Sequence, residues 1–162
     1  MKNPVHLLAG ALLAVAACGD GDDRAEPPQY FFTQTSHGAL LEDSTLTLFR
    51  VSGQTGWFTD RPSRKAGQIL TEEFLSLWGD GENSFADEPP NADFTCTIDG
   101  EVVNYVVELS SPSYVPDRPG VFCESCPVLT YDVRPVGDAA PFLESAYCTG
   151  DAHLFIEGFD PL

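Results

Sequence analysis

Cysteines carry most of the reactive chemistry that this sequence could support; they stand at positions 18, 96, 123, 126 and 148. Cys123 and Cys126 have the Cys-x-x-Cys spacing of a thiol–disulfide redox pair. Such a pair needs a helix N-terminus to lower the pKa of its first thiol. This one lies between prolines, in a loop that leads into a predicted strand. Four thiolates could also ligate zinc, but Cys96 and Cys148 stand singly rather than as a second pair.

Cys18 has a different context, because it follows the small residues Val15-Ala16-Ala17. Before them come Lys2 and an apolar run over 7–16, which is too short to span a bilayer and is typical of a secretory signal. Small residues directly before a cysteine resemble the lipobox of bacterial lipoproteins. The resemblance implies cleavage before Cys18, acylation of its thiol and its new amino group, and anchoring in a lipid bilayer.

The lipoprotein resemblance also implies in which membrane the protein is anchored and where its signal peptide, tether and domain begin and end. Gly19 follows the cysteine, where an Asp would retain an enterobacterial lipoprotein at the inner membrane. The resemblance therefore implies the outer membrane of a Gram-negative bacterium. We expect residues 1–17 to be the signal peptide, 18–28 an acidic flexible tether, and 29–162 a single β-rich domain.

Export favours disulfides for the four cysteines other than Cys18, namely Cys96, Cys123, Cys126 and Cys148. Four cysteines allow three connectivities, and the sequence does not choose among them. An oxidising compartment disfavours the zinc site. We therefore predict two disulfides of open connectivity, with the redox pair as a less favoured alternative.

The charge of the chain excludes whole classes of partner. Among 162 residues there are 8 Lys and Arg against 25 Asp and Glu, a formal net charge of −17. Nucleic-acid binding needs clustered cations, so it is excluded, and the same sign disfavours docking on anionic lipid. The hydrophobic content of 43% predicts a folded domain rather than a disordered chain.

The most distinctive stretch runs from Trp57 through Thr59-Asp60-Arg61-Pro62-Ser63 to Arg64, and Trp78 follows it. Guanidinium forks and aromatic faces recognise carboxylates or sugars, so Trp57, Asp60, Arg61, Arg64 and Trp78 are candidate binding residues. In the alternative that we favour, Asp60 and Arg61 form an ion pair that braces the turn before Pro62, and Trp78 packs in the core.

These residues also resemble an uncharacterised family of exported bacterial proteins. Its members carry an aromatic-Phe-Ser/Thr-Asp-Arg-Pro segment and then a Phe…Trp…Gly…Phe pattern. An Asp/Glu-Pro-Pro-Asn-Ala sequence follows, matched here by residues 88–92. The resemblance runs from about Thr45 to the C-terminus, with the Cys123–Cys126 loop as an insertion. It implies a β-rich tail but no activity.

No residue pattern identifies a catalytic centre. His37 and His153 lack metal-ligand spacing, and there is no nucleophile elbow or phosphate loop. With 25 acidic residues, a catalytic carboxylate pair cannot be singled out. The run at 80–84 resembles a Ca²⁺ loop, but Phe85 stands where such a loop needs Gly. We therefore predict no metal and no cofactor, and name no catalytic residue.

The elements that position these residues are mainly strands. Alternation over 93–98 and 103–109, joined by Asp99-Gly100, predicts a hairpin with a two-residue turn that places Cys96 opposite Val103. Residues 129–134, 46–51 and 154–156 are further predicted strands, and 29–35 is a weaker one. Thr71 is predicted to cap a short helix that ends at Gly79. The fold is predicted to be a mainly antiparallel β sandwich or partly open barrel with one short α-helix.

Together these features predict a lipid-anchored cell-envelope protein whose domain is a non-catalytic binding or structural module. Its partners would be the bilayer, through acylated Cys18, and an unidentified envelope protein or small ligand. The alternatives are an envelope hydrolase with an acidic catalytic residue and, less favoured, a thiol–disulfide protein.

Overall fold

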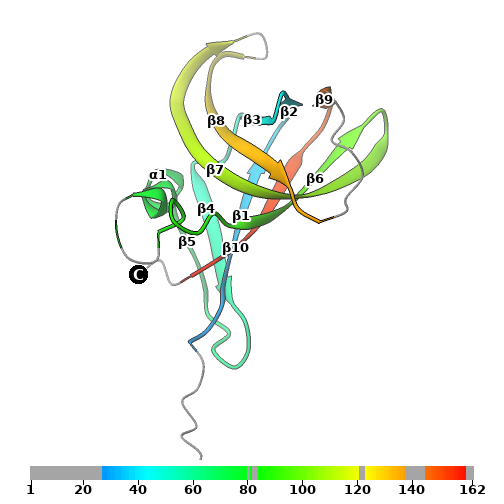
Figure 1. Cartoon of the computed structure of the whole chain (residues 1–162). Helices are drawn as coiled ribbons and strands as arrows, with labels where there is room; N and C mark the ends of the chain where they lie inside the picture. The colour runs from blue at the N-terminus through cyan, green and yellow to red at the C-terminus, as the bar shows by residue number, and fades with distance from the viewer. Residues whose placement is uncertain (1–26, 80, 82–83, 121–122, 138–144, 160–162) are drawn as a thin grey trace, which may run out of the picture.

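The computed structural model describes residues 27–79, 81, 84–120, 123–137 and 145–159. The predicted signal peptide and most of the predicted tether, with Cys18, lie outside these residues. The chain forms strands in two runs that flank one helical segment (Figure 1). The elements are β1 Tyr30–Ser36, β2 Ala39–Glu42, β3 Thr45–Phe49, β4 Gln54–Thr59, β5 Ala66–Leu70, α1 Thr71–Leu75, the 3-10 turn η1 Ser76–Trp78, β6 Asn91–Ile98, β7 Glu101–Gly120, β8 Cys123–Pro135, β9 Ser145–Cys148 and β10 Ala152–Gly158.

The strands build one antiparallel sheet in the order β5-β4-β1-β10-β6-β7-β8-β3-β2-β9, which does not close into a barrel. The predicted mainly β, antiparallel fold with one short helix is confirmed. The weakly predicted strand at 29–35 is the interior strand β1, paired with β4 on one side and β10 on the other. Side chains alternate along these strands, and one face gathers a core that includes Phe32, Phe94, Leu129 and Ile156.

The predicted hairpin is present with its predicted register. Cys96 pairs with Val103 and Phe94 with Tyr105. The turn residues Asp99 and Gly100 have φ values of 51° and 85°. Positive φ at both positions is what a type I′ turn requires, and Asp-Gly supplies it at little steric cost. Local turn chemistry therefore sets the register of β6 and β7.

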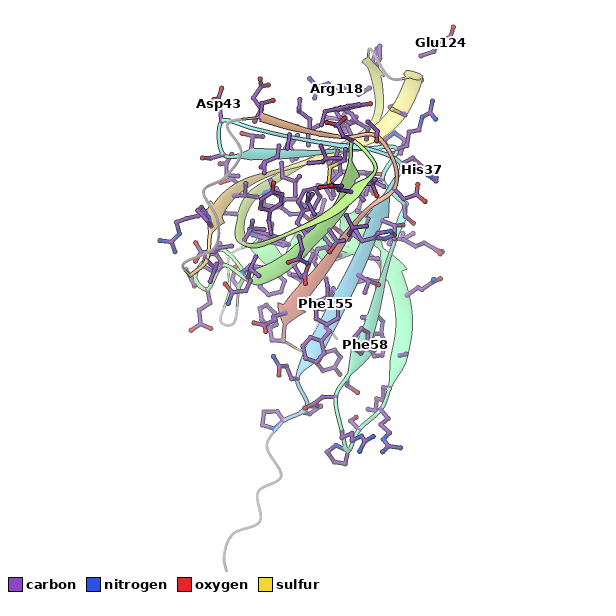
Figure 2. The ribbon with its side chains drawn as sticks, turned by 90° about the vertical axis from the view of Figure 1, so that its right-hand side faces the viewer. His37, Asp43, Phe58, Arg118, Glu124 and Phe155 are labelled. Carbon is purple, nitrogen blue, oxygen red and sulfur yellow. A yellow bond between two sulfur atoms is a disulfide. The ribbon has the colours of Figure 1, made fainter. Side chains whose placement is uncertain are left out.

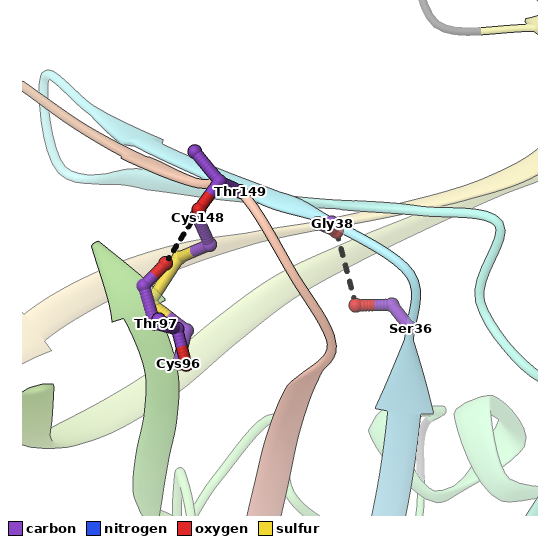
Figure 3. The surroundings of a disulfide bond; sticks show 6 residues. All are labelled: Ser36, Gly38, Cys96, Thr97, Cys148 and Thr149. Atoms are coloured by element: carbon purple, nitrogen blue, oxygen red, sulfur yellow. Dashed lines mark hydrogen bonds between the residues drawn. A yellow bond between two sulfur atoms is a disulfide. The ribbon is translucent and has the colours of Figure 1, made fainter. Parts of the chain in front are cut away.

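The sheet curls until its end strand β9 lies against β6, near the middle of the strand order. The contact is made by a disulfide between Cys96 and Cys148 (Figure 3) and by hydrogen bonds from Thr149 to the Thr97 carbonyl. The Thr149 backbone N–H donates to this carbonyl across 3.1 Å, and the Thr149 hydroxyl donates to it across 3.5 Å. Both cysteines are buried. A disulfide, rather than a ladder of strand hydrogen bonds, thus joins the end strand β9 to β6.

The helical segment differs from the prediction by one residue at its start. Leu70 is the N-cap, and the side chain of Glu73 accepts a hydrogen bond from its backbone N–H. Thr71 is the first helical residue, and its hydroxyl donates to the carbonyl of Ser52 across 2.9 Å. The Thr71 hydroxyl is therefore used for a tertiary contact instead of a cap. Phe74 anchors the helix in the core, as expected for a helix too short to be stable alone.

A buried chain of polar side chains crosses the core. The Tyr131 hydroxyl donates to Gln34 across 2.9 Å, and the Gln34 amide donates to Thr55 across 3.2 Å. Thr55 in turn shares a 3.1 Å hydrogen bond with Thr71. The chain links β8, β1, β4 and α1, so these elements are held by directional bonds as well as by apolar contact. Burial also raises the pKa of Tyr131 well above its usual range.

We expect this burial to make the fold sensitive to alkaline pH. The unfolded chain loses the Tyr131 proton near pH 10, whereas the folded protein retains it. The stabilisation is complete below about pH 10 and is lost above it, at up to about 1.4 kcal/mol per pH unit. In the Tyr131→Phe variant, the free energy of unfolding should therefore fall less steeply as the pH rises above about 10. Denaturant unfolding curves recorded at a series of pH values up to about 11.5 measure this dependence. If the free energy of unfolding of the variant depends on pH as it does in the parent protein, Tyr131 is not the source of the alkaline sensitivity.

Candidate functional site

The five predicted binding side chains do not converge on one site. Trp57, Asp60, Arg61 and Arg64 lie on β4 and in the loop that joins it to β5, whereas Trp78 ends η1. Trp57 packs against Tyr30, with ring centroids 5.7 Å apart. A Cβ atom at Gly67 would come within 2.7 Å of the Trp57 ring, so glycine allows the indole to lie on β5. Trp57 therefore has a packing role.

Asp60 braces the β4–β5 loop through the backbone and not through Arg61. Its carboxylate accepts a hydrogen bond from the Gln29 N–H, and its own N–H donates to the Gln29 carbonyl, both at 3.2 Å. The expected Asp60–Arg61 ion pair is not formed. Arg61, Arg64 and Lys65 are exposed, and none of them makes an ion pair within the described residues. The loop thus presents three cations without carboxylate partners there.

Trp78 belongs to an aromatic cluster beside the helical segment. Its ring centroid lies 4.7 Å from that of Phe85, 5.5 Å from Phe74 and 5.8 Å from Tyr131. The expectation that Trp78 packs against the core agrees with these contacts. Its indole Nε1, however, is buried and has no hydrogen-bond partner, the one such side-chain atom in the described part of the chain. An unmade hydrogen bond of this kind costs about 1–3 kcal/mol.

An open groove of about 560 Å³ runs between this cluster and β7. Its floor and walls combine apolar and hydroxyl side chains, and no lining residue is charged: Leu75, Ser76, Trp78, Gly79, Phe85, Ala86, Ser110, Ser111 and Pro112. The β7–β8 register shifts between Ser110 and Ser113, and Ser111 adopts a φ of 49°. The positive φ at Ser111 therefore belongs to an irregularity of the β7–β8 ladder, and β-bulges often lie next to binding sites. We call this feature the Trp78 groove.

A second, polar hollow was missed by the sequence analysis. It has a volume of about 400 Å³ and is lined by Thr35, Ser36, His37, Arg50, Ser52, Asp151 and His153. His37 Nδ1 lies 2.8 Å from an Asp151 carboxylate oxygen, in an exposed pair. Both histidines line the hollow because β1 pairs with β10 and places Thr35 opposite His153. That pairing joins segments more than 100 residues apart, so the hollow could not be predicted from the spacing of residues along the sequence.

The hollow does not make a metal centre. In the ranges that the structure describes, no group of three or more His, Cys, Asp and Glu side chains is arranged to hold a metal ion. The Ca²⁺-like run at 80–84 lies partly outside those ranges.

The Cys123–Cys126 segment forms the start of strand β8, so it is neither the predicted loop nor a helix N-terminus. Cys126 is buried and disulfide-bonded, and it lies opposite Arg118 in the ladder. The Cys123 side chain lies outside the described part. A strand supplies no helix dipole to lower a thiol pKa, so the local structure favours a structural role over redox chemistry.

Comparisons with known proteins add no family: no family model, curated protein or solved structure matches the chain. The resemblances to lipoproteins and to an uncharacterised exported family therefore stay predictions. Within the described residues, no helix has both the length and the apolar character needed to cross a membrane.

Proposed function

We propose that this chain is a lipid-anchored protein of the bacterial cell envelope whose β domain binds an envelope partner or a small ligand without catalysis. The order of the signal features before Cys18 supports the anchor, and Gly19 supports the outer membrane. The Trp78 groove is the observation that supports binding. Its volume is within the range of about 300–1,000 Å³ that small-molecule sites occupy.

The lining of the groove supports binding rather than reaction. It offers the aromatic surfaces of Trp78 and Phe85 and three serine hydroxyls. The Ser76 and Ser110 hydroxyls already donate to backbone carbonyls, so they offer a ligand their oxygens as acceptors. None of its lining residues is a carboxylate, a histidine or a cysteine, so a serine here would have no general base beside it. This composition is typical of sites that hold a ligand by apolar contact and orient it with a few polar groups.

The same lining indicates an uncharged ligand. A charged group moved into the groove would lose its hydration and find no opposite charge among the lining residues. An aromatic or sugar ring can stack on the half-buried Trp78, while its polar atoms bond to the serine hydroxyls. We therefore propose that the ligand, or the partner's inserted segment, is neutral and contains a ring.

A pair of probes that differ in one charge tests this proposal. We expect N-acetylphenylalanine amide, which is neutral, to shift NMR signals of the groove residues in a saturable titration. N-acetylphenylalanine, which is anionic, should bind at least about tenfold more weakly because of its uncompensated carboxylate. Trp78→Ala should weaken binding of the neutral probe by about tenfold or more, since it removes the largest contact surface.

Trp57→Ala is the matched control, because it makes the same substitution at the other tryptophan, which does not line the groove. It should leave the affinity for the neutral probe unchanged. Equal binding of the two probes, or normal binding by the Trp78→Ala variant, would contradict the proposed site. Thermal melts of both variants show whether a loss of binding is a loss of fold.

A further inference from the structure

We infer that the β4–β5 end of the domain is its membrane-facing end, where Arg61, Arg64 and Lys65 contact the phosphate headgroups of anionic lipids. The inference rests on the lipid anchor of the proposed function. It assigns a lipid ligand to the loop and an orientation to the domain.

The chain enters the domain at this end. Gln29, just before β1, is joined to Asp60 by two hydrogen bonds of 3.2 Å, one in each direction. The start of β1 and the β4–β5 connection therefore lie side by side, as Figure 1 shows at the bottom of the view. The segment that leads back to the predicted anchor at Cys18 therefore leaves the domain beside this loop.

The distance from the anchor is short. Ten residues, 19–28, separate Cys18 from Gln29. Even at full extension, a segment of that length reaches no more than about 40 Å. The loop is thus held close to the bilayer, so even a weak attraction acts at a high effective concentration.

The cations of the domain are gathered at this same end. Lys2 and Arg24 lie outside the described residues, and three of the six remaining Lys and Arg are within residues 61–65. They are exposed and make no ion pair with any described carboxylate. The net charge of −17 disfavours lipid binding by the molecule as a whole. Charges beyond a Debye length of about 8–10 Å are screened, however, so local charge decides how the loop responds. Residues 60–65 carry three cations against one acid, Asp60, a local net charge of 3 − 1 = +2.

A group of aromatic side chains lies next to the loop on the outer face of the sheet. Phe31 stacks on Phe58 and on Phe155, with ring centroids 5.4 and 5.2 Å apart. Phe155 is 39% exposed, and Phe58 precedes Thr59, whose N–H bonds to Lys65 (Figure 2). Cations beside partly exposed aromatic rings are the usual composition of a surface at a membrane interface. The rings thus extend the contact that the cations begin.

Lys65 provides a probe at the site, because Lys2 of the predicted signal peptide is the only other lysine. The experiment measures the rate at which an amine-reactive ester acetylates Lys65 in the acylated full chain, reconstituted in vesicles. We expect acetylation on vesicles with about a quarter phosphatidylglycerol to be at least about fivefold slower than on phosphatidylcholine alone. Equal rates on the two vesicles would overturn the inference.

Charge-reversal variants distinguish the contribution of the loop cations to lipid binding from that of the overall charge. Arg61→Glu with Arg64→Glu should abolish the protection of Lys65 on anionic vesicles. The single change Arg61→Glu has a matched control in Arg118→Glu, which alters the net charge equally but should keep the protection. Arg118 is also exposed, and it lies at the opposite end from Phe58 (Figure 2). Loss of protection in both single variants would mean that overall charge, not the loop, decides the interaction.

Two further outcomes are distinguishable. If the acidic residues at 20, 22, 23 and 26 cover the loop instead, Lys65 will be protected without anionic lipid. Replacing those four residues by their amides will then expose Lys65, which overturns the inference. If the anchor is absent, the chain will not remain with the vesicles at all, and the proposed function fails. Vesicle retention with unprotected Lys65 refutes the orientation alone.

Discussion

Replacing both Cys96 and Cys148 with alanine is expected to lower the free energy of unfolding by about 4 kcal/mol. The disulfide joins positions 52 residues apart, so its loss frees a long loop in the unfolded chain. In the folded chain it also removes the covalent bond between β9 and β6. The four-residue strand β9 then keeps its ladder to β2 and the hydrogen bonding from Thr149 to Thr97. For a domain of this size the melting temperature should fall by roughly 10–20 °C.

Denaturant unfolding of the two proteins, followed by tryptophan fluorescence, measures the difference. The control variant replaces Cys123 and Cys126 with alanine. A bridge between residues so close in sequence would close only a short loop and should contribute less to stability. A midpoint in the Cys96→Ala, Cys148→Ala variant equal to that of the parent protein would show that the bond does not hold the curl of the sheet.

Replacing Cys18 with alanine is expected to abolish membrane attachment. The predicted anchor consists of acyl chains on this one residue, and several chains on one residue bind a bilayer stably where a single chain is marginal. Radiolabelled palmitate should no longer be incorporated, and the protein should leave the detergent-soluble membrane fraction. The unlipidated domain should keep its melting temperature, because Cys18 precedes the residues that build the sheet.

The Cys126→Ala variant, which should still carry the label, is the control for a general effect of losing a cysteine. Continued palmitate incorporation in the Cys18→Ala protein would refute the lipoprotein assignment. Membrane association that persists without palmitate would point to another mode of attachment.

The sequence predicts those parts of the fold that depend on neighbouring residues. Asp99-Gly100 and the alternation on either side of it were sufficient to predict the register of β6 and β7, because a two-residue turn and a period of two leave one arrangement. Residues 129–134 were likewise predicted to form a strand, and they lie within β8. β5 was not predicted, because its exposed and half-buried residues show no apolar alternation.

Interactions between distant segments were not predictable in this way. Thr71 has the sequence features of a helix cap, yet its hydroxyl bonds to Ser52 because the fold places that carbonyl beside it. Asp60 precedes Arg61 in the sequence but bonds to Gln29, since β1 starts next to the end of β4. In both cases a tertiary partner replaced the local one that the sequence indicated.

The sequence by itself therefore determined that the chain is a β-rich domain behind a predicted lipoprotein signal, because periodicity, turn residues and signal features are properties of short segments. Only the tertiary structure decided which strand ends meet. It chose the Cys96–Cys148 pairing among the possible ones, placed Trp78 in a groove away from Trp57, and joined Asp60 to the chain's entry at Gln29 instead of to Arg61. These outcomes depend on how the sheet curls. The curl brings together residues that are far apart along the chain, and their spacing in the sequence does not predict the contact.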